Sequence, residues 1–225
     1  MSQMRPAAGG ESCKQDSYLY CSIIDNAIWT NWCEMEEKKM QHVKRVNREL
    51  CFEGSILDFY QDTIELPDGK CEKWDFVCHR KGAAAVLPVL EDGRVLLVRQ
   101  YRNALERETL EIPAGSRDSV TEDTKVCAAR ELEEETGYKA NQLTPLLSLK
   151  TTVAFCNEFI DVYLARDLKK GVQHLDEGEF IDLEAYELEE LTAMIAEGKI
   201  QDSKTVASIL AYQNMVLKEL MHKMA

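Results

Sequence analysis

The pattern of apolar and polar residues first predicts a small sheet in residues 52–78. Short β-type runs occupy residues 55–60, 63–66 and 73–78, and a Pro67-Asp68-Gly69 turn separates the last two. After Gly82, a run of small and branched apolar residues extends to Leu90. A second apolar run follows at residues 94–101, beyond an acidic Gly-containing turn at 91–93. This pair predicts a β-hairpin with one buried face.

The second half of the chain mixes strands and helices in an irregular order. A short strand is predicted at residues 108–112, and a helix at about residues 122–136 with Gly137 placed to end it. Further strands fit residues 143–149, 158–164 and 179–185. The end of the chain is helical, with a largely apolar face formed by Val206, Ile209, Leu210, Leu217, Leu220, Met221 and Met224. Because no βαβ unit repeats, the order favours an α+β, mixed-sheet sandwich over a Rossmann fold.

The first residues carry the weakest pattern. Residues 1–45 combine a Gly/Pro-containing start, an aromatic stretch and a charged run at 34–48 that fits a helix. We treat them as an extension of unknown role, followed by the small β-sheet region at 46–80 and one main domain at 81–225. Neither a signal peptide nor a membrane span is expected.

Composition limits the classes of molecule that the chain is expected to bind. The chain has 27 Lys and Arg against 40 Asp and Glu, a formal net charge of -13 that would repel a nucleic-acid backbone. Its eight cysteines include no Cys-x-x-Cys pair, which favours reduced thiols in a cytoplasm over disulfides or a zinc site. Nucleic acid is therefore not expected as a partner, and without a predicted span neither is a membrane.

The predicted central helix concentrates carboxylates on one side. At about 100° per residue, Glu131, Glu134 and Glu135 share a face, while Glu133 points elsewhere. Ala128, Ala129 and Leu132 lie on a neighbouring face suited to packing on a sheet. Clustered carboxylates repel one another unless a cation offsets them, and Mg²⁺ takes oxygen ligands of this kind. A solvated acidic helix face is the alternative.

The full spacing decides between these interpretations. Glu122 is followed after seven residues by the run Arg130-Glu131-Leu132-Glu133-Glu134-Glu135-Thr136-Gly137-Tyr138. This pattern resembles the Nudix box. Gly115 lies seven residues before Glu122 where the family has six, and Ser116 occupies the expected glycine position, which indicates a one-residue loop insertion. Segments 98–102, 111–115 and 176–180 resemble the ADP-ribose pyrophosphatase branch of the family.

The resemblance implies a Nudix-type mixed-sheet α/β/α sandwich with a small N-terminal antiparallel β-sheet. It also implies the metal ligands: the carboxylates of Glu131, Glu135 and Glu179 and the carbonyl oxygen of Ala114. Glu134 would be a ligand or a neighbour of the ligands. In this branch the general base lies on a loop outside the box, where Glu177 and Glu179 are both candidates, with Glu134 as the fallback proton acceptor.

Three residues are candidates for substrate binding. Arg102 resembles the branch's substrate-binding arginine, and a guanidinium can bind pyrophosphate oxygens in a bidentate way. Glu111 begins the second flanking segment. Trp74 lies at a position similar to an adenine-stacking tryptophan, with a core tryptophan as the competing interpretation.

Together these resemblances imply a Mg²⁺-dependent hydrolase, with Mn²⁺ as the alternative metal, that cleaves ADP-ribose to AMP and ribose 5-phosphate. They also imply a homodimer formed through the small sheet. Segment 151–156 lacks a proline that often accompanies ADP-ribose preference, so a UDP- or GDP-sugar remains an alternative substrate. A non-catalytic Nudix-fold sensor is the alternative outside the enzymes, and the intact glutamates Glu131, Glu134 and Glu135 argue against it.

Overall fold

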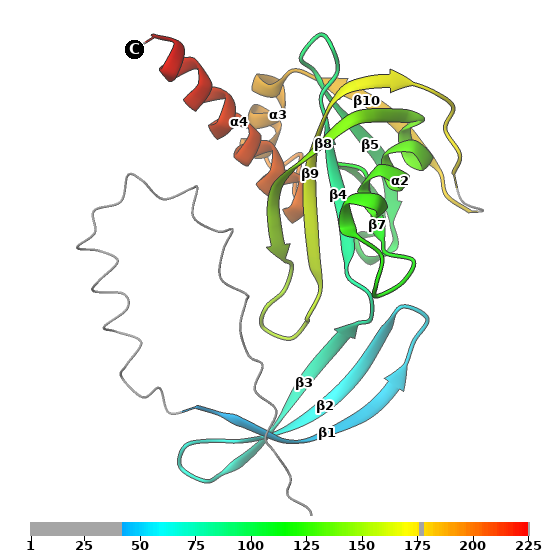
Figure 1. Ribbon diagram of the computed structural model, residues 1–225. Helices are drawn as coiled ribbons and strands as arrows, with labels where there is room; N and C mark the ends of the chain where they lie inside the picture. The colour runs from blue at the N-terminus through cyan, green and yellow to red at the C-terminus, as the bar shows by residue number, and fades with distance from the viewer. Residues whose placement is uncertain (1–41, 176–177, 225) are drawn as a thin grey trace, which may run out of the picture. The chain divides into compact units, whose positions relative to one another are not determined.

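The structure is a computed structural model that describes residues 42–175 and 178–224. Its strands form three sheets (Figure 1). The first, of order β1-β2-β3, contains β1 (Lys44–Glu53), β2 (Leu57–Glu65) and β3 (Cys71–His79). The second, of order β10-β5-β6, contains β5 (Val95–Arg102), β6 (Arg107–Glu111) and β10 (Ile181–Tyr186), and all its pairs are antiparallel.

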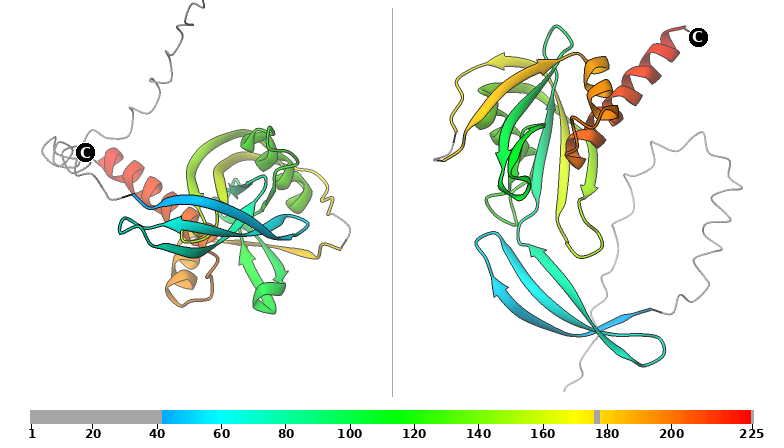
Figure 2. Two further views of the ribbon diagram at one scale, coloured as in Figure 1. Left: turned by 90° about the horizontal axis from the view of Figure 1, so that it is seen from below. Right: turned by 180° about the vertical axis from the view of Figure 1, so that it is seen from behind.

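The third sheet is mixed and carries the central helix. It has the order β7-β4-β9-β8, with β4 (Ala83–Pro88), β7 (Ala114–Ser116), β8 (Tyr138–Lys150) and β9 (Phe159–Lys170). Strands β4 and β9 are parallel, whereas β7 and β8 pair antiparallel to their neighbours. The helices are α2 (Thr124–Thr136), α3 (Leu188–Ala196) and α4 (Ser203–Met224), and a 3-10 turn, η1, spans Asn103–Leu105. The views in Figure 2 show α2 apart from the α3–α4 pair. The mixed-sheet sandwich and the small N-terminal sheet are confirmed.

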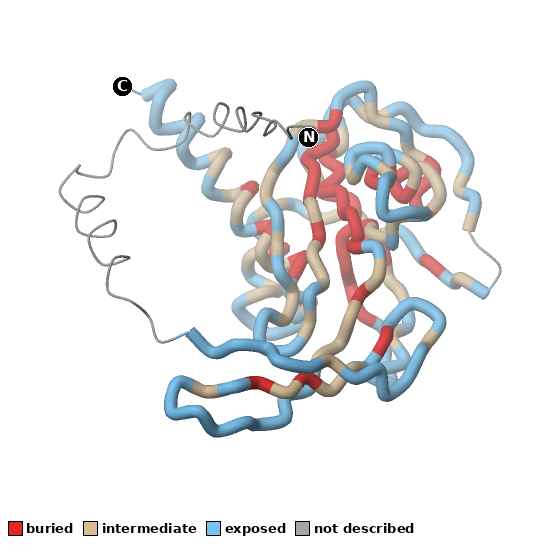
Figure 3. Tube along the Cα trace, turned by 60° about the horizontal axis from the view of Figure 1, so that its bottom comes forward, coloured by how far each residue is buried: buried red, intermediate tan, exposed pale blue. Residues whose placement is uncertain are grey.

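Strand β4 separates two apolar cores. Ala83, Ala85 and Leu87 belong to a core that also contains residues of β5, β6, β9, α3 and α4. Ala84 and Val86 belong to a second core with Cys127, Ala128 and Leu132 of α2 and Tyr163 of β9. All six residues of β4 are buried, so the strand has no polar face. Figure 3 shows this burial along the Cα trace.

The predicted hairpin at residues 82–101 is wrong in its pairing. Strand β4 pairs with β7 and β9, and β5 pairs with β6 and β10, so the two runs lie in different sheets. One bridge, between Val89 and Val95, joins them beside the turn. The reason is burial on both faces of β4, which places it inside a sheet rather than in a two-stranded ribbon.

Other predicted boundaries also need correction. Residues 44–48, predicted as part of a helix, belong to β1, where the Arg48 guanidinium binds Asp62 of β2 with two bonds of 2.6 Å. The rest of that run, 34–41, lies outside the described residues. The predicted strands 55–60 and 63–66 form one strand, β2. Strand β10 begins at Ile181, so Glu179 precedes it.

The ends of α2 agree closely with the sequence. Asp123 caps its start by accepting a bond of 2.7 Å from the backbone N–H of Lys125. Gly137 ends it in the left-handed region at a φ of 71°, as expected for a glycine at this position. In α4, the predicted apolar face is buried only in part: Ile209 is inaccessible, whereas Leu210 is 43% and Met221 69% exposed. Within the described ranges, no helix is long and apolar enough to cross a membrane.

Candidate active site

The site is built around the carboxylate face of α2. The helix packs on β4 through Cys127, Ala128 and Leu132, which are all fully buried. The expectation that Ala129 packs with them is wrong, because Ala129 is exposed. This packing turns Glu131 and Glu135 toward β7, where they are 8% and 3% exposed. Glu134 is partly exposed on the same side, and Glu133 points elsewhere and pairs with Lys139 at 2.7 Å. The predicted sharing of one face by three glutamates therefore agrees with the structure.

Gly115 lets the backbone of β7 approach the helix. A Cβ atom at this position would lie 2.2 Å from the carboxylate of Glu131, so any side chain here would displace that carboxylate. One residue earlier, the backbone N–H of Ala114 donates to Glu135 Oε2 at 3.1 Å. The carboxylates of Glu131 and Glu135 therefore lie against one short stretch of β7, at Ala114 and Gly115.

Burial makes two of these carboxylates reluctant to ionise. Burial raises the pKa of Glu131 to about 7, and the nearby charges of Glu134 and Glu179 act in the same direction. Burial likewise raises the pKa of Glu135 to about 8, with contributions from the charges of Glu131 and Glu179. A divalent cation would reverse these shifts. Glu179 is thus close enough to act on both carboxylates, whereas Glu177 lies outside the described residues.

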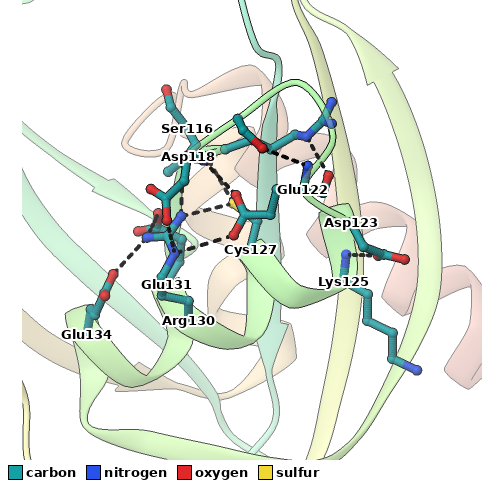
Figure 4. A network of polar contacts seen from close by, with 12 residues as sticks. Ser116, Asp118, Glu122, Asp123, Lys125, Cys127, Arg130, Glu131 and Glu134 are labelled. Atoms are coloured by element: carbon teal, nitrogen blue, oxygen red, sulfur yellow. Dashed lines mark hydrogen bonds and ion pairs between the residues drawn. The ribbon is translucent and has the colours of Figure 1, made fainter.

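Arg130 neutralises part of the cluster (Figure 4). Its Nη1 donates to Glu131 Oε1 at 2.7 Å and to Glu134 Oε2 at 2.9 Å, and its Nη2 donates to the carbonyl oxygen of Ser116 at 3.1 Å. Its Nε is buried without a hydrogen-bond partner. With Glu131 and Glu134 turned toward this guanidinium, no three His, Cys, Asp or Glu side chains in the described part of the chain form a ready metal site.

The loop between β7 and α2, residues 117–123, is held in shape by hydrogen bonds from its own side chains. Glu122 Oε2 accepts from the backbone N–H of Asp118 at 2.6 Å, and its Oε1 lies 3.7 Å from Nε of Arg130. The Nε of Arg117 donates to the carbonyl oxygen of Glu122 at 2.8 Å. Helix α2 starts at Thr124, so Glu122 belongs to this loop and not to the helix as predicted. The loop in which an insertion is predicted therefore ends before the helix that carries the glutamates.

A cleft of about 550 Å³ opens beside β7. Its lining includes Ala114, Arg102 and Glu111 on one part of the chain and Thr151, Glu158 and Lys204 on others. Two of the three candidate substrate-binding residues therefore meet here. Trp74 is not among the lining residues. It is 45% exposed and its Nε1 donates to Glu72 Oε2 at 3.3 Å, so the competing interpretation as a core tryptophan is wrong.

Arg102 and Glu111 form an ion pair at the cleft, in which the Glu111 carboxylate is buried and the Arg102 side chain is 40% exposed. Nε and Nη2 of Arg102 donate to the two carboxylate oxygens of Glu111 at 2.7 and 2.6 Å. Lys204 Nζ donates to Glu111 Oε2 and lies 3.0 Å from Asp202 Oδ2. Although burial alone would raise the pKa of Glu111, its bonds to Arg102 and Lys204 lower it to about 2.

Lys204 was missed by sequence reasoning. It lies in the first turn of α4, where the partial positive charge of the helix terminus disfavours a cation. That unfavourable placement is the signal that could have identified it.

The chain is similar to proteins of known families. The NUDIX domain model matches residues 79–209. A methanol dehydrogenase activator of Bacillus methanolicus is 40% identical over 188 residues, covering 82% of this chain and 99% of the relative. An ADP-ribose pyrophosphatase of Bacillus subtilis (strain 168) is 38% identical over 178 residues, covering 78% and 94%.

A solved structure has the same fold. The crystal structure of an ADP compounds hydrolase superposes with a TM-score of 0.72 at 21% identity, covering 81% of this chain and 98% of that chain. At this identity the similarity concerns the fold alone.

Proposed function

Since this chain belongs to the Nudix family and is a Nudix hydrolase of nucleotide sugars, we propose that its substrate is ADP-ribose and that its products are AMP and ribose 5-phosphate. The observation that carries the proposal is the position of Arg102. Its guanidinium lines the cleft that Ala114 also lines, and its charge partly opposes the burial that raises the pKa of Glu135. A diphosphate bound by Arg102 would therefore lie beside the carboxylate face of α2. The ADP-ribose pyrophosphatase among the relatives supports the choice of nucleotide.

The residues fit a divalent cation, and we propose Mg²⁺, with Mn²⁺ as the alternative. Two buried carboxylates with raised pKa values lie beside a strand that approaches them closely at Gly115, where a Cβ atom would meet the Glu131 carboxylate, and together they make a compact oxygen-rich site. Glu131, Glu135, Glu179 and the carbonyl oxygen of Ala114 would hold the cation, which when bound neutralises phosphate charge and acidifies a coordinated water. Arg130 would hold Glu131 and Glu134 in position.

The proton acceptor is proposed to lie on the loop before β10, at Glu177 or Glu179. Glu179 acts electrostatically on Glu131 and Glu135, which favours it as a ligand and leaves Glu177 as the base. On this assignment, Glu179→Gln should raise the magnesium concentration needed for half-maximal activity, whereas Glu177→Gln should lower turnover at an unchanged magnesium requirement. Magnesium titrations of the two variants test this. Full activity in both would move the proton acceptor to Glu134.

We also propose that residues 46–80 form the dimerisation region of a homodimer and residues 81–225 the catalytic domain. Support comes from large apolar side chains that the small sheet leaves exposed, among them Leu50, Phe52 and Trp74 at 48%, 66% and 45%. Trp74 would then stack on the adenine of the substrate. Sedimentation equilibrium should give twice the monomer mass, and a monomer at micromolar concentration would contradict the proposal.

A substrate panel tests the proposed function against its alternatives. ADP-ribose, UDP-sugars and GDP-sugars are each incubated with the protein and Mg²⁺, and the phosphate monoesters released are measured. We expect the highest kcat/KM with ADP-ribose. A higher value with a UDP- or GDP-sugar would reassign the nucleotide. Binding of ADP-ribose without any product would identify a sensor.

A further inference from the structure

Glu111 has its acceptor positions filled by the protein. It ends β6 and is 2% exposed. Its Oε1 accepts from Arg102 Nε at 2.7 Å and Thr109 Oγ1 at 2.5 Å, and its Oε2 accepts from Arg102 Nη2 at 2.6 Å and from Lys204 Nζ. A carboxylate offers about four lone-pair positions, and four donors occupy them here. Glu111, predicted to bind the substrate, is thus held by four donors from the protein itself.

Arg102 is the neighbour that faces the cleft. Glu111 engages its Nε and Nη2, which fixes the plane of the guanidinium. In the described part of the chain, no hydrogen bond is recorded for Nη1, and the side chain is 40% exposed at the cleft. The two N–H groups of Nη1 are thus held in a set direction and can donate to a phosphate oxygen.

Lys204 secures the same carboxylate from another element. Its side chain is 9% exposed, and its Nζ reaches both Glu111 and Asp202. Burying a lysine in the first turn of a helix is costly, because desolvation and the helix dipole both oppose the charge. Asp202 in turn accepts hydrogen bonds from the backbone N–H and Oγ1 of Thr205 at 3.0 and 2.6 Å. The carboxylate that pairs with Lys204 is therefore itself held in place by the first turn of α4.

We propose that Lys204 is a positioning residue for substrate binding: it fixes Glu111 from α4, and Glu111 fixes Arg102. The proposal rests on the proposed function, because Arg102 is taken to bind the diphosphate. Without Lys204, Oε2 of Glu111 loses its contact to α4, and the carboxylate and guanidinium can rotate together. Arg102 then has to be ordered when the substrate binds, which weakens binding.

A double-mutant cycle of Lys204→Met and Arg102→Ala tests this coupling. Methionine keeps the length of the side chain and removes its charge. Arg102→Ala should raise KM by about tenfold or more with a smaller change in kcat, and Lys204→Met should raise KM by roughly fivefold. In the Arg102→Ala background, Lys204→Met should change KM no further, because the residue through which it acts is gone.

The controls separate positioning from direct contact and from stability. Lys218→Met makes the same change at an exposed position of α4 and should leave KM and the unfolding temperature unchanged. An equal rise in KM from Lys204→Met in both backgrounds would overturn the proposal, since the lysine would then contact the substrate itself. A lower unfolding temperature with an unchanged KM would also overturn it. If Lys204→Met does not fold, Lys204→Gln takes its place in the cycle.

Failure of the proposed function gives a different result. If the wild-type protein hydrolyses no compound of the panel, the proposed activity is wrong. The same cycle is then measured on the dissociation constant of ADP-ribose by calorimetry. Non-additive losses of affinity at Lys204 and Arg102 would support the coupling, and additive losses, or no binding by the wild type, would overturn it.

Discussion

Replacing Glu135 by glutamine is expected to lower turnover by at least about a hundredfold while leaving the protein folded. Loss of a residue that merely supports a metal ligand costs 10–100-fold, and Glu135 is proposed to be a ligand itself. Glutamine keeps the volume and still offers an oxygen to the N–H of Ala114, which Glu135 accepts at 3.1 Å. Initial rates at saturating ADP-ribose with Mg²⁺ measure the effect.

Thermal unfolding of the metal-free protein provides the control. The folded-state pKa values of Glu131 and Glu135, about 7 and 8, lie above the ordinary value of 4.5. The stability that these groups contribute is therefore fully present below about pH 4.5 and is lost as the pH rises through 7 to 8. Glutamine at position 135 removes its share of this loss, so the variant should unfold at an equal or higher temperature near pH 8. Activity like that of the wild type would exclude Glu135 as a ligand.

Replacing Gly115 by alanine is expected to abolish metal-dependent activity almost completely. The added Cβ would lie 2.2 Å from the Glu131 carboxylate, so that side chain must leave its place between β7 and α2. The displaced carboxylate can no longer share a cation with Glu135. We expect activity at saturating ADP-ribose and Mg²⁺ to fall at least about a hundredfold, as for loss of a ligand.

A matched substitution identifies the cause. Gly93 lies in the turn before β5, and a Cβ there meets no atom within 4 Å, although its φ of 90° makes alanine strained. Gly93→Ala should therefore lower the unfolding temperature and leave kcat and the magnesium requirement unchanged. If Gly115→Ala behaves like Gly93→Ala, the close approach of β7 to α2 has no catalytic importance.

The sequence could predict the parts of the site that share one element. Glu131, Glu134 and Glu135 are separated by helical spacing, so their common face follows from geometry alone, and Asp123 and Gly137 mark the helix ends by their chemistry. The pairing of β4 and β5 could not be read in the same way. Its outcome depends on which faces other segments cover, and a continuous apolar run does not specify that.

Lys204 shows most clearly which contacts could not be predicted from the sequence. It lies 93 residues from Glu111, and the contact depends on how α4 packs against the sheet. Local spacing contains no information about such a contact. The surroundings of Glu111 could not be predicted for the same reason. The donors around its carboxylate come from several elements, and they are known only when all of these elements are placed.

Because β4 is buried on both faces, substitutions at neighbouring positions of this strand affect different cores. Ala84 and Ala85 are both inaccessible, but Ala84 packs under α2 and Ala85 faces the core shared with α3 and α4. A larger side chain at 84 therefore acts first on the packing of α2, and one at 85 acts on the remainder of the fold. Both substitutions should lower the unfolding temperature, because both sites are fully packed, but only the one at 84 should also displace the carboxylate face of α2.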